Sequence, residues 1–249
     1  KTQVVTFGTI TAPVVNQGTL VFRGSSNQLS GGLTTSAGSK LRMEGDGFFA
    51  DSTLTVSSGF VNHGVIELTS INSQASATLQ VNTGTLTNAA DGSLQTQVGT
   101  TGARRLTAQL SNQGSVQIGQ SLTIDKNSAS HVNAGTIQLT GGDLLVTQSG
   151  SSATLTNTGT ITIGSGRTLQ IDQSTLNYTS GLIGGPGTLK LTQSTAANAE
   201  ESAAASEELS AQATELNGLV GELMEVVYGK GNAGADFDDN SRALMAEDR

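Results

Sequence analysis

Two aspartates occupy the same place in two similar stretches of the chain, which makes them the first candidates for catalytic chemistry. Asp125 follows the Leu-Thr-Ile of residues 122–124, and Asp172 follows the Leu-Gln-Ile of residues 169–171. If these stretches are strands two rungs apart in a coil, with Thr147 between them, the carboxylates lie about 9.6 Å apart. That distance is at the outer limit for the acid–base pair of an inverting glycosidase.

The other groups that such chemistry needs are sparse. Arg167 is the one basic residue that the pattern places near the aspartates, whereas a sugar-cleaving site needs basic and aromatic groups to hold its substrate. His63 and His131 fall near corners of different columns, and we expect both to face solvent. The Gly-Gly-Asp at 141–143 is similar to a calcium-binding nonapeptide, but it occurs once, and that motif binds metal as an array. We predict no enzyme, no cofactor and no metal site, and keep a polysaccharide-cleaving β-helix as the second alternative.

A short phrase recurs along the chain: Asn, any residue, Gly, usually a small polar residue, then alternating apolar residues. Successive copies, including a looser one at Asn88, begin 46, 26, 24, 21 and 24 residues apart, and the first step is close to two units of 23. A period of this size is typical of a solenoid whose repeats stack as coils. The corner residues of the clear copies are Asn16 and Gly18, Asn62 and Gly64, Asn112 and Gly114, Asn133 and Gly135, and Asn157 and Gly159.

The corners and the segments between them predict the same fold. Gly adopts positive φ without penalty, and Asn can hydrogen bond to its own backbone, so the phrase suits a tight corner. Asn at equivalent corners could also form a ladder of side-chain amides along the axis. Between corners, Leu, Ile and Val alternate with Thr and Gln, so one set points inward and the other outward. The sequence predicts a mainly β fold, a parallel β-solenoid of roughly eight coils between Val14 and Leu191, followed by a helix.

Charge divides the chain near Ser194. Residues 1–194 carry nine Lys/Arg and eight Asp/Glu, whereas residues 195–249 carry three and twelve. Neither part has a basic stripe, so we expect no nucleic-acid partner. The chain has no cysteine, which excludes disulfides and thiolate chemistry, and no apolar run approaches the ~18 residues of a membrane-spanning segment. Because the chain opens on Lys1, we expect a processed or truncated piece of a protein.

We therefore divide the chain into a β-solenoid domain at 1–193, a coiled-coil-type helix at 194–228 and a flexible acidic tail at 229–249. Heptads in the helix bring small and apolar residues into one seam, which predicts a helix partner for 195–228. The a positions are Ala199, Ser206, Ala213, Val220 and Val227, and the d positions are Ser202, Leu209, Leu216 and Leu223.

The repeats resemble those of bacterial surface β-helix proteins, the adhesins and haemagglutinin-like exoproteins. The likeness rests on phrases such as Asn-Thr-Gly-Thr-Ile-Thr-Ile-Gly at 157–164, followed by Thr-Leu-Gln-Ile at 168–171, and it covers residues 1–193. It implies an extracellular or cell-surface location and a structural or adhesive function. The expected partners are a glycan or surface ligand, or further copies of the chain, that contact a repetitive Thr/Asn/Gln surface.

Residues 195–228 resemble a different family, the C-terminal end of methyl-accepting chemotaxis receptors. Residues 196–205 show that family's methylation pattern of two small residues, a Glu pair and two small residues. The resemblance implies methylation at the pair Glu200 and Glu201, with the second acid esterified. It also implies a cytoplasmic location and an alternative function in chemotaxis signalling. Because the two resemblances imply different compartments, we interpret the chain as a fusion.

Overall fold

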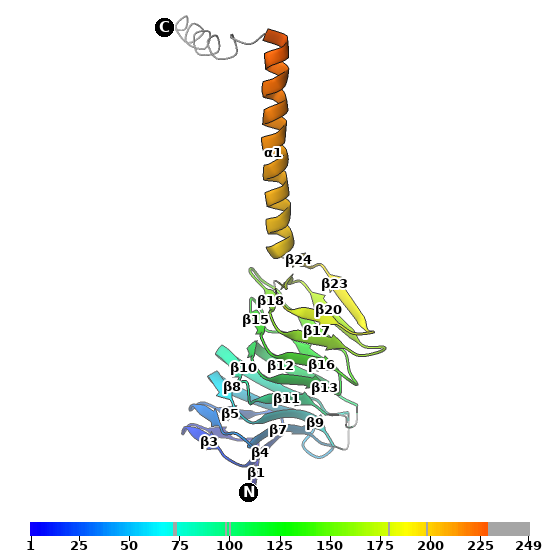
Figure 1. Ribbon diagram of the computed structural model, residues 1–249. Helices are drawn as coiled ribbons and strands as arrows, with labels where there is room; N and C mark the ends of the chain where they lie inside the picture. Colours follow the sequence, from blue (N-terminus) through cyan, green and yellow to red (C-terminus); the bar gives the residue numbers. More distant parts are fainter. Residues whose placement is uncertain (72–73, 98, 100, 179, 198, 229–249) are drawn as a thin grey trace, which may run out of the picture. The chain divides into compact units, whose positions relative to one another are not determined.

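A computed structural model describes residues 1–228 apart from 72–73, 98, 100, 179 and 198; within 195–207, and at 225 and 228, it describes the backbone course only. The chain separates into two units, Lys1–Asn198 and Ala199–Arg249. The first unit is a parallel β-solenoid, as the repeats predict, and the second contains a single described helix, α1 (Ala199–Tyr228). Figure 1 shows the two units in chain order.

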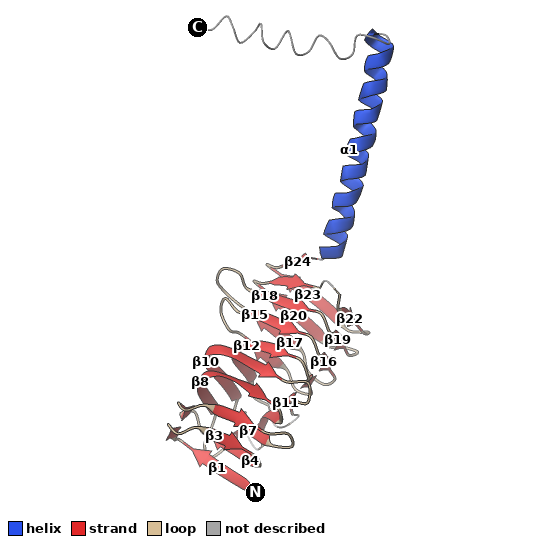
Figure 2. Cartoon of the chain, turned by 60° about the vertical axis from the view of Figure 1, so that its left-hand side comes forward, coloured by secondary structure: helices blue, strands red, loops and turns tan. Residues whose placement is uncertain are grey.

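Parallel strands stack rung upon rung along one long sheet, which we call sheet A (Figure 2). Its strands, in order, are β1 (Thr2–Thr6), β4 (Thr19–Arg23), β7 (Lys40–Gly45), β9 (Val65–Ser70), β11 (Ser93–Thr96), β13 (Ser115–Ile118), β16 (Thr136–Leu139), β19 (Thr160–Ile163) and β22 (Leu182–Gly184). Each strand comes from the next coil of the chain, so neighbours in sheet A are one repeat apart in sequence.

A second stack, sheet B, forms the next side of each coil. Its main path is β2 (Thr9–Ile10), β5 (Asn27–Leu29), β8 (Ser52–Asn62), β10 (Ala77–Asn88), β12 (Arg104–Asn112), β14 (Leu122–Ile124), β17 (Leu144–Thr147), β20 (Thr168–Asp172) and β23 (Thr188–Thr192). A shift of register within β10, between Gln80 and Thr85, interrupts the ladder from β10 to β12. The C-terminal ends of the long strands β8, β10 and β12 form a third side of their coils.

The third side continues through the later coils in β15 (Ser130–Asn133), β18 (Thr154–Asn157), β21 (Thr175–Asn177) and β24 (Thr195–Ala197), each parallel to the last. In the first two coils the same side is formed by β3 (Val14–Asn16) and β6 (Leu33–Thr35). Nine strands therefore stack in sheet A, and about seven full turns lie between the terminal rungs, close to the eight coils expected.

The core is a set of aliphatic columns, one residue per rung, as the period-two pattern predicts. Leu41 pairs with Ile66, Ile66 with Leu94, and the column continues through the equivalent residues of β13, β16 and β19. All of these side chains are buried. Each buried Leu or Ile contributes roughly 1.5–3 kcal/mol relative to exposure, so the stacked columns supply the driving force for coil upon coil.

The helix differs from its expected bounds at one end. Residues 195–197 form β24, which pairs with β21, so α1 begins at Ala199 instead of directly after Ser194. The reason is backbone pairing. The N–H and C=O groups at the edge of β21 hydrogen bond to the backbone of residues 195–197, so the helix starts only after them. No helix in the described part of the chain is both long and apolar enough to span a membrane. The predicted acidic tail at 229–249 lies outside the described residues.

Candidate functional site

The corner asparagines form a buried ladder inside the solenoid. The side-chain amide of each donates to the side-chain oxygen of the next rung, from Asn62 to Asn88 (2.9 Å), to Asn112 (2.8 Å), to Asn133 (2.7 Å) and to Asn157 (2.7 Å). All five side chains are at most 1% exposed. Asn16 lies at the same corner in the first coil, but its partner in register is Thr35, whose hydroxyl donates to Asn62 (2.9 Å). The predicted ladder is therefore present. Its asparagines are buried, however, so they are not part of the outer Thr/Asn/Gln surface that the sequence predicts.

The corner glycines are needed for space and not for their φ angles, which corrects the expectation of positive φ. Gly64, Gly114, Gly135, Gly159 and Gly18 are not among the residues with positive φ. A Cβ on Gly135 would instead overlap the carbonyl oxygen of Gly114, and a Cβ on Gly159 would overlap that of Gly135. The glycines stack along the axis because the backbone of one corner packs directly onto the next.

The proposed aspartate pair is aligned as the sequence predicts, but Asp125 is engaged by other groups. Thr147 and Asp172 are partners in register, and the residue before Asp125 pairs with Val146, so the two aspartates are two rungs apart. Arg105 forms an ion pair with Asp125, and the hydroxyl of Thr107 donates to its Oδ1 (2.6 Å). The basic group beside Asp125 is thus Arg105.

The expected basic neighbour of the pair, Arg167, makes a different contact: its guanidinium donates to the carbonyl of Gly141 (3.0 Å). Asp143, of the calcium-like motif, accepts from the backbone N–H of Thr168 (2.8 Å) and so anchors the following coil. In the described part of the chain, no group of three His, Asp or Glu residues is placed to hold a metal ion.

The two histidines have opposite environments, and one of them contradicts the expectation. His63 is an exposed corner residue whose Nδ1 lies 2.8 Å from Asp91 Oδ1, and this hydrogen bond holds the pKa of Asp91 below its ordinary value. His131 is 1% exposed and is in register with Leu155 in the apolar core. Its Nδ1 accepts from the Leu110 N–H (3.1 Å), while Nε2 has no hydrogen-bond partner among the described residues. Burial lowers the pKa of His131 to about 4.

A network of ion pairs lies on the outward side of sheet A, in strands β4, β7 and β9. Arg42 Nε lies 2.8 Å from Glu44 Oε2 and 3.0 Å from Glu67 Oε1, so one guanidinium joins both carboxylates. Lys40 Nζ is 2.7 Å from Glu67 Oε2, and Arg23 pairs with Glu44. The side chains of Glu44 and Glu67 are 5% and 6% exposed. Charges this well buried are stable only when they are paired, and each carboxylate here has two cations.

Part of this network lines a cleft of about 500 Å³ beside β7 and β9. Its lining includes Lys40, Arg42 and Glu67 of the network, together with Thr69, Ile71 and Gln97. With three cations and three carboxylates, counting Asp46 beside Arg23 (3.6 Å), the network has no net charge. Of these groups, Lys40, Arg42 and Glu67 line the cleft, and all three are already engaged in ion pairs of the network.

The charged network continues directly into a row of polar side chains. Arg42 is in register with Glu67, Glu67 with Gln95, and Gln95 with Gln117, which pairs with Gln138 in β16. Gln117 and Gln138 are exposed. We call this row, Arg42–Glu67–Gln95–Gln117–Gln138, the polar track; its successive members are about 4.8 Å apart.

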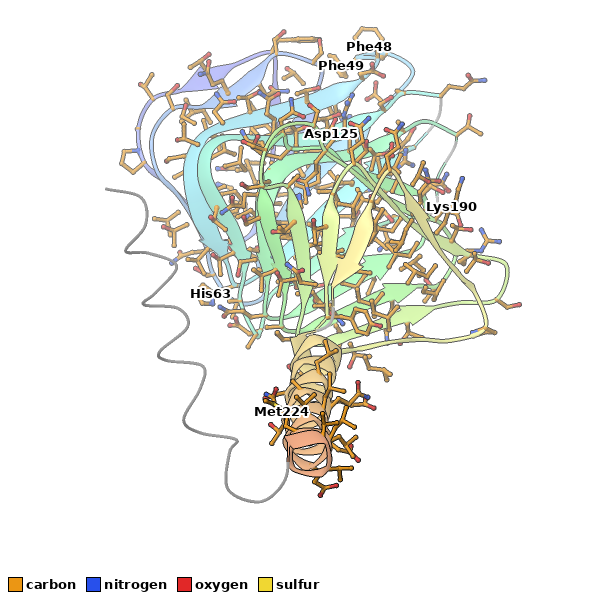
Figure 3. All side chains as sticks on the ribbon, turned by 90° about the horizontal axis from the view of Figure 1, so that it is seen from above. Phe48, Phe49, His63, Asp125, Lys190 and Met224 are labelled. Atoms are coloured by element: carbon orange, nitrogen blue, oxygen red, sulfur yellow. The ribbon has the colours of Figure 1, made fainter. Side chains whose placement is uncertain are left out.

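An exposed aromatic loop adjoins the same network. Asp46, beside Arg23, accepts from the backbone N–H groups of Phe48 (2.9 Å) and Phe49 (2.6 Å). Phe48 is 86% exposed, and its ring centroid is 4.8 Å from that of Phe49. Figure 3 shows both rings at the periphery of the solenoid, on a different side from His63.

Sequence reasoning missed the network, the track and the aromatic loop. The signal was present as charged residues at every second position of Lys-Leu-Arg-Met-Glu at 40–44, in a chain with only 13% charged residues. The partner, Glu67, lies 25 residues from Arg42 in sequence, and only the register of the coils shows that the two are neighbours. The sequence of this strand by itself therefore gives no sign that its charges are paired across coils.

The predicted methylation residues Glu200 and Glu201 lie in α1, but their side chains are outside the described part of the structure. Methylation at these positions stays a prediction. Comparison with known protein families, curated proteins and solved structures finds no match to this chain. The class defined by the fold is accordingly a parallel β-solenoid repeat protein.

Proposed function

We propose that this solenoid is a non-enzymatic structural or adhesive element that attaches to a cell surface, a glycan or neighbouring copies through its outward polar side chains. The observation that carries the proposal is the glutamine row of sheet A, where Gln95, Gln117 and Gln138 occupy one register position in three successive rungs. Side chains repeated at the rung spacing suit a ligand or surface that is itself repetitive. An extracellular or cell-surface location is part of this proposal.

The ladder and the outer surface have separate roles in this proposal. The buried asparagines and the stacked glycines hold successive coils in register, and Thr and Gln form the contact surface. Polysaccharide cleavage would depend on two carboxylates, Asp125 and Asp172, and Asp125 is already paired with Arg105. This pairing argues against that alternative. No contact of the described residues favours chemotaxis signalling, which remains an alternative based on the sequence of 195–228.

Attachment can be measured with labelled protein on cell-wall glycan layers and on a layer of the protein itself. The double change Gln117→Glu and Gln138→Glu puts two like charges in neighbouring rungs and is expected to weaken attachment, since these outward side chains make the contact. The matched control, Gln80→Glu with Gln170→Glu, puts the same charge on sheet B and is expected to retain attachment. Wild-type protein that adheres to none of these layers contradicts the proposal.

A further inference from the structure

We propose that the polar track and its adjoining cleft form a binding site for a linear, uncharged polysaccharide. This inference rests on the proposed function, because it names the ligand class and the face of the solenoid that does the attaching. It draws on the geometry of the track, the ion pairing beside the cleft and the exposed aromatic loop.

The geometry of the track suits an extended sugar chain. Five outward side chains from Arg42 to Gln138 are in register on consecutive strands, at about 4.8 Å per rung. One pyranose residue of an extended chain is close to that length, so successive sugars meet successive rungs. Gln97 Nε2 donates to Gln95 Oε1 (2.8 Å) and holds this part of the track in place.

The ion pairs beside the cleft favour one type of glycan. Sugar hydroxyls both donate and accept hydrogen bonds, and they match a wall that presents Lys40 and Arg42 as donors and Glu67 as an acceptor. The charged groups of this wall are already paired with one another, so a polyanion or a polycation would have to displace an existing ion pair. An uncharged chain leaves the existing ion pairs intact.

The aromatic loop supplies the apolar contact that the polar track lacks. The faces of sugar rings that carry C–H groups pack on aromatic rings, and Phe48 is 86% exposed on a loop fixed by Asp46. Because the backbone of the loop is already hydrogen bonded to Asp46, presenting this ring costs little ordering on binding. Phe48 is therefore the expected aromatic platform, next to the Asp46 end of the ion-pair network.

Isothermal titration calorimetry on the full chain tests this proposal. The ligands are linear neutral oligosaccharides of glucan, mannan and xylan, each of three and six units, and polygalacturonate is the charged comparison. For the neutral series that binds, we expect the hexamer to bind more tightly than the trimer, because it covers more rungs. Gln95→Arg blocks the track beside Glu67, and we expect an affinity loss of about tenfold or more. Phe48→Ala is expected to weaken binding several-fold.

The controls place the same changes elsewhere. Gln170→Arg puts the same cation on sheet B, and Leu182→Ala shortens another exposed apolar side chain, which is 62% exposed; both are expected to bind like wild type. The site is wrong if wild-type protein binds neutral glycans and Gln95→Arg binds them equally well. The ligand class is wrong if polygalacturonate alone binds. If no sugar binds while the protein still adheres to cell-wall layers or to itself, this inference fails and the proposed function survives.

Discussion

At the scale of single residues, the solenoid depends on a few positions where a change of one group disturbs its neighbours above and below. The asparagine ladder is the clearest case, because each amide both donates to and accepts from an adjacent rung. Such a chain of buried hydrogen bonds is costly to break, since the partners left behind stay out of reach of water.

Asn112→Ala is therefore expected to destabilise the protein by about 2–3 kcal/mol, because it leaves the Asn88 amide and the Asn133 oxygen without their partner. Urea unfolding followed by circular dichroism measures this loss. The matched control is Asn82→Ala, at an exposed position, for which we expect a change below about 0.5 kcal/mol. Equal stability of the two variants contradicts a structural role for the ladder.

The corner glycines allow a second matched pair. Gly135→Ala brings a methyl group against the carbonyl of Gly114 and is expected to cost about 1–3 kcal/mol through overpacking. Gly32→Ala meets no atom within 4 Å, and since its φ is not positive, we expect a neutral or slightly stabilising change. Thermal unfolding of both variants compares them; a Gly135→Ala protein as stable as wild type contradicts close packing of the corners.

His131 makes the stability of the fold depend on pH. Its pKa in the folded protein is about 4, below the ordinary 6.5, so folding favours the neutral ring. The contribution of neutral His131 to the free energy of unfolding is fully present above pH 6.5. It is lost as the pH falls toward 4, which lowers the free energy of unfolding by up to about 3 kcal/mol. We expect this loss in urea titrations of wild type and of the exposed-site control His63→Gln, and a smaller loss in His131→Leu. An unchanged pH profile in His131→Leu contradicts the assignment.

At the scale of elements, strands and helix differ in how their apolar residues are covered. The central coils of the solenoid bury their inward aliphatic side chains against neighbouring coils, whereas α1 leaves its heptad leucines exposed. Leu209, Leu216 and Leu223 are 66%, 63% and 62% exposed. An apolar seam of this kind is stabilised when a second helix packs on it.

We expect the full chain to self-associate through α1, and Leu216→Gln to weaken that association because it removes a d-position contact. The matched control is Leu219→Gln, which changes a leucine of similar exposure (56%) outside the a and d positions. Sedimentation velocity at several concentrations compares wild type with both variants. A wild-type chain that stays monomeric throughout contradicts the coiled-coil prediction.

At the scale of the whole molecule, the strands of each coil pair with those of the coils beside it, so stability is approximately a sum over neighbouring coils. A central rung has two neighbours, and its inward residues are fully covered: Leu106 is 0% exposed. A terminal rung has one neighbour, and Leu189 in β23 is 41% exposed. The terminal rungs are therefore the least stable part of the solenoid.

Leu106→Ala is expected to cost about 2–4 kcal/mol, and Leu189→Ala less than about 1 kcal/mol, because the central site leaves a cavity that cannot fill with water. Urea unfolding measures both values. Hydrogen exchange in wild type should show early opening of the last rung while the central strands stay protected. Equal costs for the two substitutions contradict a nearest-neighbour stack.

The sequence by itself determined the solenoid, its core and its amide ladder. These features depend on the period of the Asn-x-Gly phrase and on the alternation of Leu, Ile and Val with Thr and Gln, and both patterns are local. Segments that alternate in this way and recur at a fixed period stack with their apolar residues in columns, as the column from Leu41 onward does.

Only the tertiary structure decided which side of each corner faces solvent and which distant residues meet. His131 is buried because it lies two residues before the inward Asn133 on the same strand, β15, where it is in register with Leu155. Gly135 is fixed by a carbonyl from the preceding coil, and Arg42 meets Glu67 only when two coils are stacked in one register. Residues 20 or more positions apart become neighbours through register, and the repeat phrase alone does not specify it at every rung.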